Sequence, residues 1–547
     1  MAVIYVKSQK CTDLQEAENL TLREAAALVN GSLRPEQLSP SKQAQITGSL
    51  SEPNEILLDL PDPKTVLWNQ EDLQEPIRIA SPYPVSIRGN GACLDGCHAA
   101  AGIQIESSHV TIWDLHFKGF FFAVRIDSRE KHIEDIALKR CSFQELDMAG
   151  VCVGASESGG IIQNVDVDSC EFIGAEELEA ASLQKYTMSI MVQAAMAQGR
   201  RTVRDCLLDG MTIQNNRFTG SARININITA VFQERVYEDT GTQFENCRIS
   251  GLRIENNYMK SGWDAVINYL GASRNSRSCS LENVSICRNE IYFRAWGIYL
   301  AAGEPGLNGY SEDCRLSHCR IEENTIELYE KVGRPSGGIV LNGGRTDFEP
   351  AVVKRCCQSH IHICRNRITG SDRGIMLTAA HAMVDSEPPA ILEGCEIQDV
   401  IIEENEIRNV KKPFLLAAAY LEGRRVVLHY GLPPKTKIYA PLRREHQSVS
   451  LTAQNNRIDH VQIRRNHMTE TEYMLVAAAS IARGHSLSRQ NILGADIIFE
   501  DNTFEESEEH ILICEESHED WAAGEGNRTE AVFKELAIPR QTGVLKA

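Results

Sequence analysis

The chain contains no run of about 18 or more consecutive apolar residues, which is the length that a membrane-spanning helix needs. Its start, Met-Ala-Val-Ile-Tyr-Val-Lys-Ser-Gln-Lys, also lacks the charged, apolar and cleavable segments of a secretory signal. Together these absences predict a cytoplasmic protein with no membrane partner.

Basic side chains are too few to balance the acidic ones. The sequence has 56 Lys and Arg against 75 Asp and Glu, which gives a formal net charge of −19. A surface that binds nucleic acid needs a basic footprint, so we expect no nucleic-acid partner. The acidic balance also weighs against a strongly anionic polymer as substrate, unless a local basic groove offsets it.

Cysteine motifs typical of metal sites are missing as well. Of the 17 cysteines, Cys93 and Cys97 form a C-x3-C pair next to His98, but the second half of a zinc site is absent from the sequence. Six others recur at one register of the repeat described next: Cys206, Cys247, Cys279, Cys314, Cys356 and Cys395. We expect these to stack inward as small hydrophobic residues, and we expect no metal and no cofactor.

One repeated pattern fills most of the chain. In the copy from Cys247 to Met259, a small residue is followed by an apolar one, an apolar-x-apolar strand, an asparagine and one more apolar residue. The asparagine recurs at the same register in eight copies: Asn216, Asn257, Asn289, Asn324, Asn366, Asn405, Asn466 and Asn502. The period of two is that of a strand and not of a helix. Short strands separated by inserts of unequal length predict a coil of stacked rungs, with the asparagines in a ladder at one bend.

A second short strand follows the asparagine in several copies, as in Gly297–Leu300 and Gly338–Leu341. Two or three such strands per turn predict an all-β protein, a parallel β-helix whose rungs lie about 4.8 Å apart. We expect residues 1–84 to form a cap, with a helix over 21–30, and residues 85–514 to form the coil. Residues 515–547 would close its far end, with Trp521 either plugging the core or making an oligomer contact.

The sequence around the first rungs carries a resemblance to a known superfamily. The segments Glu75-Pro-Ile-Arg-Ile79 and Val85-Ser-Ile-Arg-Gly-Asn-Gly-Ala-Cys-Leu-Asp-Gly96 resemble the start of pectate-lyase-like right-handed parallel β-helix proteins. The likeness extends from about Leu22 to Cys514. It implies a right-handed coil and activity on carbohydrate, because families of this fold include polysaccharide lyases, glycoside hydrolases, fructotransferases and epimerases.

Long inserts follow the second strand in most copies. Those at 194–205, 232–246, 304–313, 345–355 and 381–393 leave the coil at similar places, so we expect them to gather on one flank and wall a groove. The insert at 421–455 is the largest and is expected to act as a lid.

Two sets of residues flank the second strand at matching positions. The set before it comprises Trp263, Asp264, Arg294, Trp296, Arg334, Asp372, Arg373, Lys411 and Lys412. The set after it comprises Glu234, Arg235, Glu304, Arg345, Asp347, His381, Tyr420 and Glu422. Aromatic, carboxylate and arginine side chains in register indicate a surface that binds an oligosaccharide or polysaccharide, although a solvated edge with surface ion pairs accounts for them as well. Small residues before the second set, such as Ala379 and Ala380, would leave a shallow floor for a sugar ring, or serve tight loop turning.

Glycoside hydrolysis by a pair of carboxylates is the activity we favour at this stage. Carboxylates one or two rungs apart fall near the ~5–9.5 Å separations of glycosidases. Asp264 is the candidate for one carboxylate, with Glu304 or Glu234 as its partner. His381 and Arg373 would orient hydroxyl groups or steady developing charge.

Other activities stay open. A lyase or uronate epimerase would need a base beside the uronate carboxyl and a cation to neutralise it, for which Lys411, Lys412, Arg373 and Arg294 are candidates. The sequence has no compact Asp-rich calcium cluster and no paired-Asp motif of the polygalacturonase type. An intracellular fructotransferase or difructose anhydride hydrolase remains as a fold analogy. The non-catalytic alternative is a β-helix that binds a polymer or acts as a scaffold, with a trimer as its oligomeric form.

Overall fold

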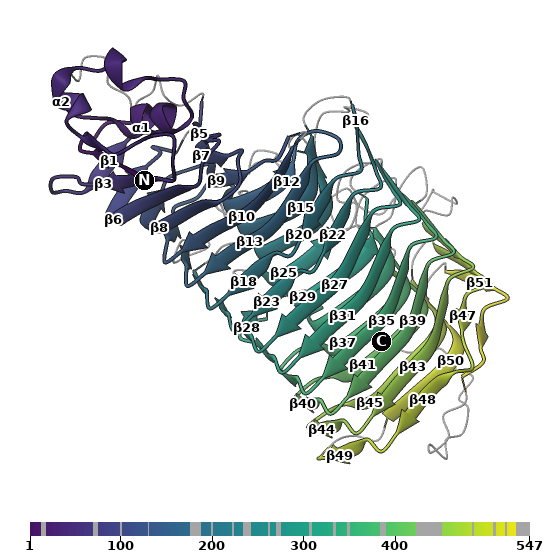
Figure 1. The fold of residues 1–547 in the computed structure, drawn as a ribbon. Helices are drawn as coiled ribbons and strands as arrows, with labels where there is room; N and C mark the ends of the chain where they lie inside the picture. Colours follow the sequence, from purple (N-terminus) through teal and green to yellow (C-terminus); the bar gives the residue numbers. More distant parts are fainter. Residues whose placement is uncertain are drawn as a thin grey trace, which may run out of the picture.

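The computed structural model describes residues 1–11, 18–68, 75–98, 101–129, 131–174, 187–197, 201–220, 224–233, 242–260, 263–269, 275–305, 309–331, 335–346, 351–382, 390–422, 451–483, 486–506, 510–519 and 522–531. The chain forms one elongated right-handed parallel β-helix, with its short helices gathered at the N-terminal end (Figure 1). These helices are α1 (Leu22–Val29), the 3-10 helix η1 (Pro35–Gln37) and α2 (Pro40–Gln43). Neither α-helix in these ranges is long and apolar enough to cross a membrane.

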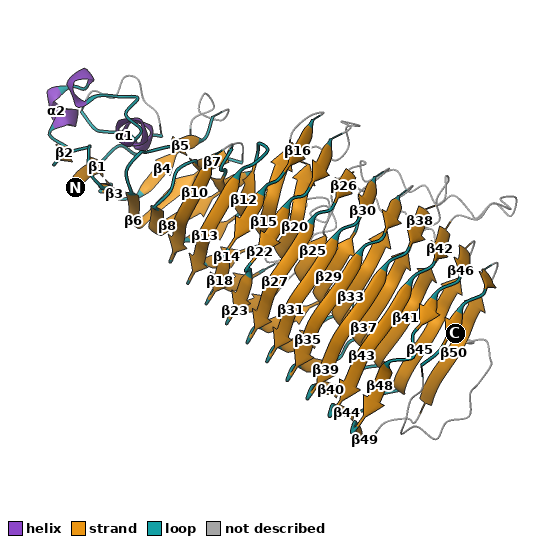
Figure 2. Cartoon of the chain, turned by 45° about the vertical axis from the view of Figure 1, so that its right-hand side comes forward, coloured by secondary structure: helices purple, strands orange, loops and turns teal. Residues whose placement is uncertain are grey.

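Three sheets run along the coil and form its faces (Figure 2). Sheet B consists of β5 (Ile77–Ile79), β7 (Ala101–Ile105), β9 (Phe122–Ile126), β12 (Ala149–Ala155), β15 (Met188–Ala197), β20 (Ile224–Gln233), β25 (Asp264–Tyr269), β29 (Trp296–Gly303), β33 (Gly337–Thr346), β37 (Arg373–Ala382), β41 (Lys412–Glu422), β45 (Tyr473–Arg483) and β50 (His510–Glu519). Sheet C consists of β16 (Thr202–Arg204), β21 (Gln243–Glu245), β26 (Asn275–Arg277), β30 (Tyr310–Glu312), β34 (Val352–Lys354), β38 (Ala390–Glu393), β42 (Leu451–Gln454), β46 (Ser486–Arg489) and β51 (Ala523–Glu525).

Sheet A is the largest and takes two or three strands from most coils. It consists of β1 (Ala2–Val6), β2 (Ile46–Thr47), β3 (Asn54–Leu58), β4 (Thr65–Leu67), β6 (Val85–Asp95), β8 (Val110–Lys118), β10 (His132–Lys139), β11 (Ser142–Gln144), β13 (Ile161–Asp168), β14 (Glu171–Ile173), β17 (Leu207–Asp209), β18 (Thr212–Gln214), β19 (Arg217–Thr219), β22 (Arg248–Ser250), β23 (Arg253–Glu255), β24 (Tyr258–Lys260), β27 (Ser280–Cys287), β28 (Glu290–Phe293), β31 (Arg315–Glu322), β32 (Thr325–Leu328), β35 (Cys357–Cys364), β36 (Arg367–Thr369), β39 (Glu396–Glu403), β40 (Glu406–Arg408), β43 (Arg457–Arg464), β44 (His467–Thr469), β47 (Ile492–Leu493), β48 (Ile497–Glu500), β49 (Thr503–Glu505) and β52 (Arg528–Thr529). A representative coil runs from β31 through the bend at Asn324 to β32, then to β33 in sheet B and β34 in sheet C.

The predicted asparagine ladder is confirmed. Asn324 donates from Nδ2 to Asn366 Oδ1 at 2.9 Å, and its backbone amide donates to the same oxygen at 3.1 Å. The same pair of bonds links each neighbouring couple from Asn216 to Asn502. Because each side chain satisfies a buried amide of the adjacent rung, the ladder fixes the register of this bend.

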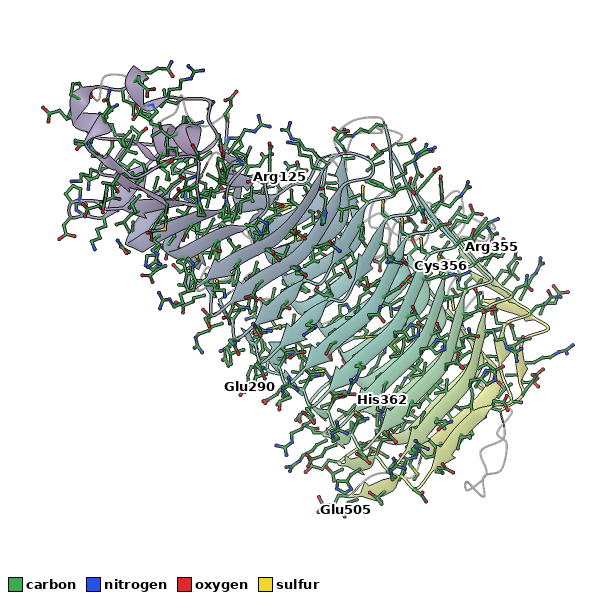
Figure 3. All side chains as sticks on the ribbon, viewed as in Figure 1. Arg125, Glu290, Arg355, Cys356, His362 and Glu505 are labelled. Carbon is green, nitrogen blue, oxygen red and sulfur yellow. The ribbon has the colours of Figure 1, made fainter. Side chains whose placement is uncertain are left out.

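A second ladder, which the sequence analysis missed, lies at the bend between sheets C and A. Asn456 donates to Asn491 Oδ1 at 2.8 Å, and Asn491 donates to Asn527 Oδ1 at 2.9 Å. In earlier coils the stacked cysteines occupy the same position as these asparagines. Cys395 is the last of them, and its backbone amide donates to Asn456 Oδ1 of the next rung. The six cysteines are buried, as predicted; Cys356 lies at this bend beside the exposed Arg355 (Figure 3).

The interior of the coil is apolar and stacked from rung to rung. Phe117, Phe143, Phe172 and Phe218 form a column with ring centroids 4.7–5.1 Å apart and nearly parallel planes. Identical residues stack because each strand pairs in register with its counterpart one rung away, at about 4.8 Å.

At the N-terminal end, Thr21 caps α1 through the predicted capping box with Glu24. Strands β3 and β5 of the expected cap pair in parallel with β6 and β7 of the expected coil, and β1 pairs in parallel with β3. At the other end β51 and β52 continue the coil to Thr529. Trp521 lies outside the described residues, and the expected division at residues 84 and 514 stays a prediction.

The inserts are shorter than the sequence analysis expected. Strand β33 extends to Thr346 and β34 starts at Val352, both within the insert expected at 345–355. The remaining segments connect the ends of sheet B strands with the starts of sheet C strands, so they begin and end at one corner of the coil. The expected groove wall and the lid at 421–455 fall mainly on residues outside the described ranges.

Candidate functional site

The outer face of sheet B carries the residues that the sequence analysis singled out. Along each strand, side chains alternate between the core and this face. In β37, Ile375 and Leu377 belong to the core, whereas Met376 belongs to a second apolar cluster on the outer face. Polar side chains lie between the apolar residues of this second cluster. These polar side chains form the candidate functional site.

At the start of the sheet B strands, one row of residues pairs in register. Asp264, Trp296, Gly337, Arg373 and Lys412 are successive partners across β25, β29, β33, β37 and β41. A Cβ atom on Gly337 would lie 2.9 Å from the indole of Trp296. Glycine is needed there because the indole ring lies against its backbone.

A second row lies near the end of the same strands. Arg345, His381 and Tyr420 are in-register partners, and Glu304 follows Gly303, which pairs with Gly344. The small residues just before this row, including Ala302, Ala379, Ala380, Ala418 and Ala419, face the core. Two consecutive inward residues mark a corner in β37 and β41. Ala301 and Ala417, which also belong to the predicted floor, lie in the outer apolar cluster, so the floor stays a prediction.

Glu304 lies at the centre of the first part of the site, the Glu304 cluster, which also contains Trp296, Tyr299 and Arg345. The Tyr299 hydroxyl donates to Glu304 Oε2 at 2.9 Å, and Arg345 Nη1 lies 3.7 Å from Oε1. The Arg345 guanidinium lies 4.6 Å from the Tyr299 ring centroid and 6.0 Å from that of Trp296. Glu304 is 5% exposed and Arg345 3%. A charge-assisted pair held by two aromatic rings is rigid and largely dry.

His381 lies at the centre of the second part, the His381 cluster, together with Arg373 and Tyr420. Arg373 Nη2 donates to the Tyr420 hydroxyl at 2.7 Å, and the His381 ring meets the Tyr420 ring edge-on at 5.3 Å. His381 is fully buried, and neither of its ring nitrogens has a hydrogen-bond partner. Burial, followed by the charges of Arg345 and Arg373, lowers the pKa of His381 well below its usual value. The imidazole is therefore neutral at physiological pH.

Asn342 connects the two clusters. It lies on β33 between Ala301 and Thr378, and its Oδ1 accepts a hydrogen bond from the Thr378 hydroxyl. Its Nδ2 is fully buried and has no hydrogen-bond partner. A buried donor without a protein partner is available to an ordered water or to a ligand oxygen.

Burying an ion costs several kcal/mol, which a salt bridge offsets only in part, and the stacked core and the ladders already stabilise the coil. Ionisable groups that are buried outside the core, with a perturbed histidine among them, indicate a functional site.

Asp264 and Glu304, the predicted carboxylate pair, have different hydrogen-bond partners. Asp264 Oδ1 accepts a hydrogen bond from the Trp296 amide at 3.1 Å, at the start of β29. Glu304 follows the other end of β29 and accepts a hydrogen bond from Tyr299. The pairing of Asp264 with Glu304 stays a prediction.

The other expected residues are distributed as follows. Arg294 pairs with Glu330 at 2.5 Å, and Asp372 pairs with Lys331 at 2.7 Å, so both lie in ion pairs at the edge of the site. Trp263 packs against the outer apolar cluster. Some of the predicted residues lie outside the part of the chain that the structure describes: Glu234, Arg235, Arg334, Asp347 and the side chain of Glu422.

Tyr299 and Asn342 were not predicted from the sequence. Both lie inside strands that were predicted to be apolar, and each is two positions from another residue whose side chain lies on the outer face. The period of two places them on the outer face, and this signal could have found them.

Three solved structures are similar to this chain. A mannuronic-acid-specific polysaccharide family 6 lyase from human gut microbiota has a TM-score of 0.30 at 11% identity, and the match covers 88% of this chain and 81% of the lyase. A GH136 lacto-N-biosidase from Eubacterium ramulus has a TM-score of 0.29 at 9% identity, covering 76% and 65%. PfbA, a surface adhesin of Streptococcus pneumoniae, has a TM-score of 0.27 at 11% identity, covering 66% and 84%. No protein-family model and no curated protein matches the chain. At these values the fold rests on the strand pairing of the chain itself, and the similarities say nothing about activity.

Proposed function

We propose that this chain is a carbohydrate-active enzyme that cleaves uronate-containing glycans by β-elimination on the outer face of sheet B. The observation that carries the proposal is a neutral, unbonded His381 between two buried arginines. A base next to two cations is what removal of a proton beside a carboxylate requires.

The chemistry divides among the residues of the two clusters. Arg345 and Arg373 bind the uronate carboxylate and neutralise it, which acidifies the hydrogen on C5. His381 takes that proton, the C5–H electron pair forms the C4=C5 double bond, and the bond from C4 to the glycosidic oxygen breaks. The Tyr420 hydroxyl, which accepts a hydrogen bond from Arg373, gives its proton to the departing oxygen.

Substrate binding itself prepares the base. In the free site the two arginines and burial keep the pKa of His381 low, which makes it a weak base. A bound uronate brings a negative charge that offsets the arginines, so the pKa of His381 rises toward the range in which an imidazole accepts a proton. Activation of the base is thereby coupled to an acidic sugar.

Glycoside hydrolysis is the second candidate, and Glu304 is the residue that favours it. Glu304 is a buried carboxylate that accepts a hydrogen bond from Tyr299. Its ion pair with Arg345 suits an ionised carboxylate, whereas a general acid must carry a proton. Asp264, whose Oδ1 accepts a hydrogen bond from the Trp296 amide, is the carboxylate that would have to complete the pair for hydrolysis.

The test is to incubate the protein with polygalacturonate, alginate and hyaluronan, and separately with neutral glycans. Elimination creates a conjugated double bond, which is followed by ultraviolet absorbance, while reducing ends report any cleavage. We expect His381→Gln to lower kcat by about 100-fold or more and Tyr420→Phe by about 10-fold or more. His467→Gln, on sheet A, is the matched control and should keep full activity.

Two results would contradict the proposal. Reducing ends without absorbance would identify a hydrolase, and Glu304→Gln would then be the variant that loses activity. No cleavage of any of these glycans, or full activity in His381→Gln, would remove the elimination mechanism.

A further inference from the structure

Buried amides without partners continue along the outer face of sheet B beyond the Glu304 cluster, toward the N-terminal end. Gln193 on β15 is fully buried, and neither its Oε1 nor its Nε2 has a hydrogen-bond partner. Asn227 on β20 is 3% exposed; its Oδ1 has no partner, and its Nδ2 contacts only the Met188 sulfur, at 3.1 Å. Thioether sulfur is a weak acceptor, so both amides have hydrogen-bonding capacity left.

Both side chains point away from the core. Val192 and Ala194, on either side of Gln193, belong to the core, and Met191, the in-register partner of Asn227, belongs to the outer apolar cluster. Around the two amides this outer face is lined by Cys152, Met188, Met191 and Met196, none of which is charged. This part of the face, the Gln193 strip, therefore differs from the cationic His381 cluster.

We propose that the Gln193 strip binds uncharged sugar units of the same glycan whose uronate lies against His381. This inference rests on the proposed function and names its substrate class: a glycan in which neutral units adjoin a uronate. An amide donates and accepts at once, as neighbouring sugar hydroxyls do, and thioether and thiol side chains offer an apolar surface to the C–H face of a ring. The described residues of the strip itself are uncharged, and the first cation beside it is Arg125, the in-register neighbour of Cys152.

The spacing of the rungs sets the length of the ligand. Asn227 on β20 lies two strands from Tyr299 on β29, or about 10 Å, and Gln193 on β15 lies five strands from His381 on β37, or about 24 Å. An oligosaccharide that runs along the coil axis reaches both, and a single sugar does not.

An open hollow adjoins the far end of the strip. A cavity of about 800 Å³ is lined by Gln104, Arg125, Asp127, Arg129, Lys131, Ser156, Glu157, Met196, Ala197 and Arg201. Met196 also approaches Gly154 together with Gln193, within 2.8 Å and 3.3 Å of the position that a Cβ atom would take. The hollow therefore extends from Met196 to Arg125, a residue that Figure 3 labels.

The test compares Gln193→Leu and Asn227→Leu with Gln398→Leu, a matched control on the outer face of sheet A. Calorimetry measures the binding of xylotetraose, mannotetraose and cellotetraose. We expect at least one of these to bind the unchanged protein, Gln398→Leu and His381→Gln alike, and to bind the two strip variants about 10-fold more weakly. Both strip variants should unfold at the same temperature as the unchanged protein or higher, because each removes a buried amide with unmet hydrogen bonds; a purely structural amide would instead lower it.

The outcomes separate the subsite from the reaction. If tetrasaccharide binding depends on Gln193 and Asn227 but no elimination occurs, the subsite stands and the proposed function fails. If elimination occurs but Gln193→Leu changes neither KM on a mixed neutral and acidic glycan nor the Kd of any tetrasaccharide, the subsite is refuted and the reaction stands. Failure of all three tetrasaccharides to bind, with an unchanged KM in the variants, also refutes it.

Discussion

Removing one asparagine from the middle of the long ladder tests how much the ladder stabilises the coil. Asn366 is 1% exposed. Its Nδ2 donates to the Ile321 carbonyl at 2.8 Å, the Cys364 carbonyl at 3.1 Å and Asn405 Oδ1 at 3.0 Å. Its Oδ1 accepts from the Asn324 amide at 3.1 Å and from Asn324 Nδ2 at 2.9 Å. Asn366→Ala breaks all of these bonds and leaves the backbone in place.

The expected cost follows from which groups lose their last partner. The Asn324 amide loses the acceptor that this side chain provides, and the Ile321 carbonyl loses its donor. Each of these buried groups lowers the free energy of unfolding by about 1–3 kcal/mol. The bonds between side chains add about 1 kcal/mol, so the total is about 3–7 kcal/mol. Asn502→Ala, at the end of the ladder, is the matched control: it breaks similar bonds, but Asn502 is half-buried, so water replaces them and the cost is about 1–2 kcal/mol.

Urea denaturation followed by circular dichroism gives the total loss of stability. Because a coil can unfold in parts, native-state hydrogen exchange at the Asn324 amide gives the local loss. We expect that amide to exchange at least about 100-fold faster in Asn366→Ala. Equal losses for Asn366→Ala and Asn502→Ala, or unchanged exchange at Asn324, would show that the ladder does not hold the rungs.

Two further predictions concern single side chains. Burial and neighbouring cations lower the pKa of Lys412 to about 8 from 10.5, so the native state binds this proton less tightly than the unfolded state, and the free energy of unfolding should rise between pH 8 and 10.5. Lys412→Met should raise that free energy at pH 7 by about 1–3 kcal/mol, allowing for partial exposure, and abolish the rise; a lower stability at pH 7 in urea denaturation would contradict this. Phe172 is stacked between Phe143 and Phe218 at 4.7 and 4.8 Å, so Phe172→Ala should cost about 3–5 kcal/mol in the same assay. Phe121→Ala, at a side chain 46% exposed, is the control, and a similar cost for both would refute the role of the stack.

The sequence by itself determined the coil, the asparagine ladder and the rows of residues along sheet B. A side-chain period of two and a repeated register can be read from residues near one another in the chain. In-register pairing then requires equivalent residues of successive rungs to lie side by side, which is why Arg345, His381 and Tyr420 could be placed in one row.

Only the tertiary structure decided which members of these rows meet. At the corners of the strands Ala302, Ala379 and Ala380 turn into the core, whereas Ala301 stays on the outer face. Long side chains then reached along the strands, so Arg345 lies beside Glu304 and Tyr299, and Arg373 bonds Tyr420 from the opposite row. Such contacts depend on where a strand bends and on how far a side chain extends, and neither quantity is present in the spacing of residues along the chain.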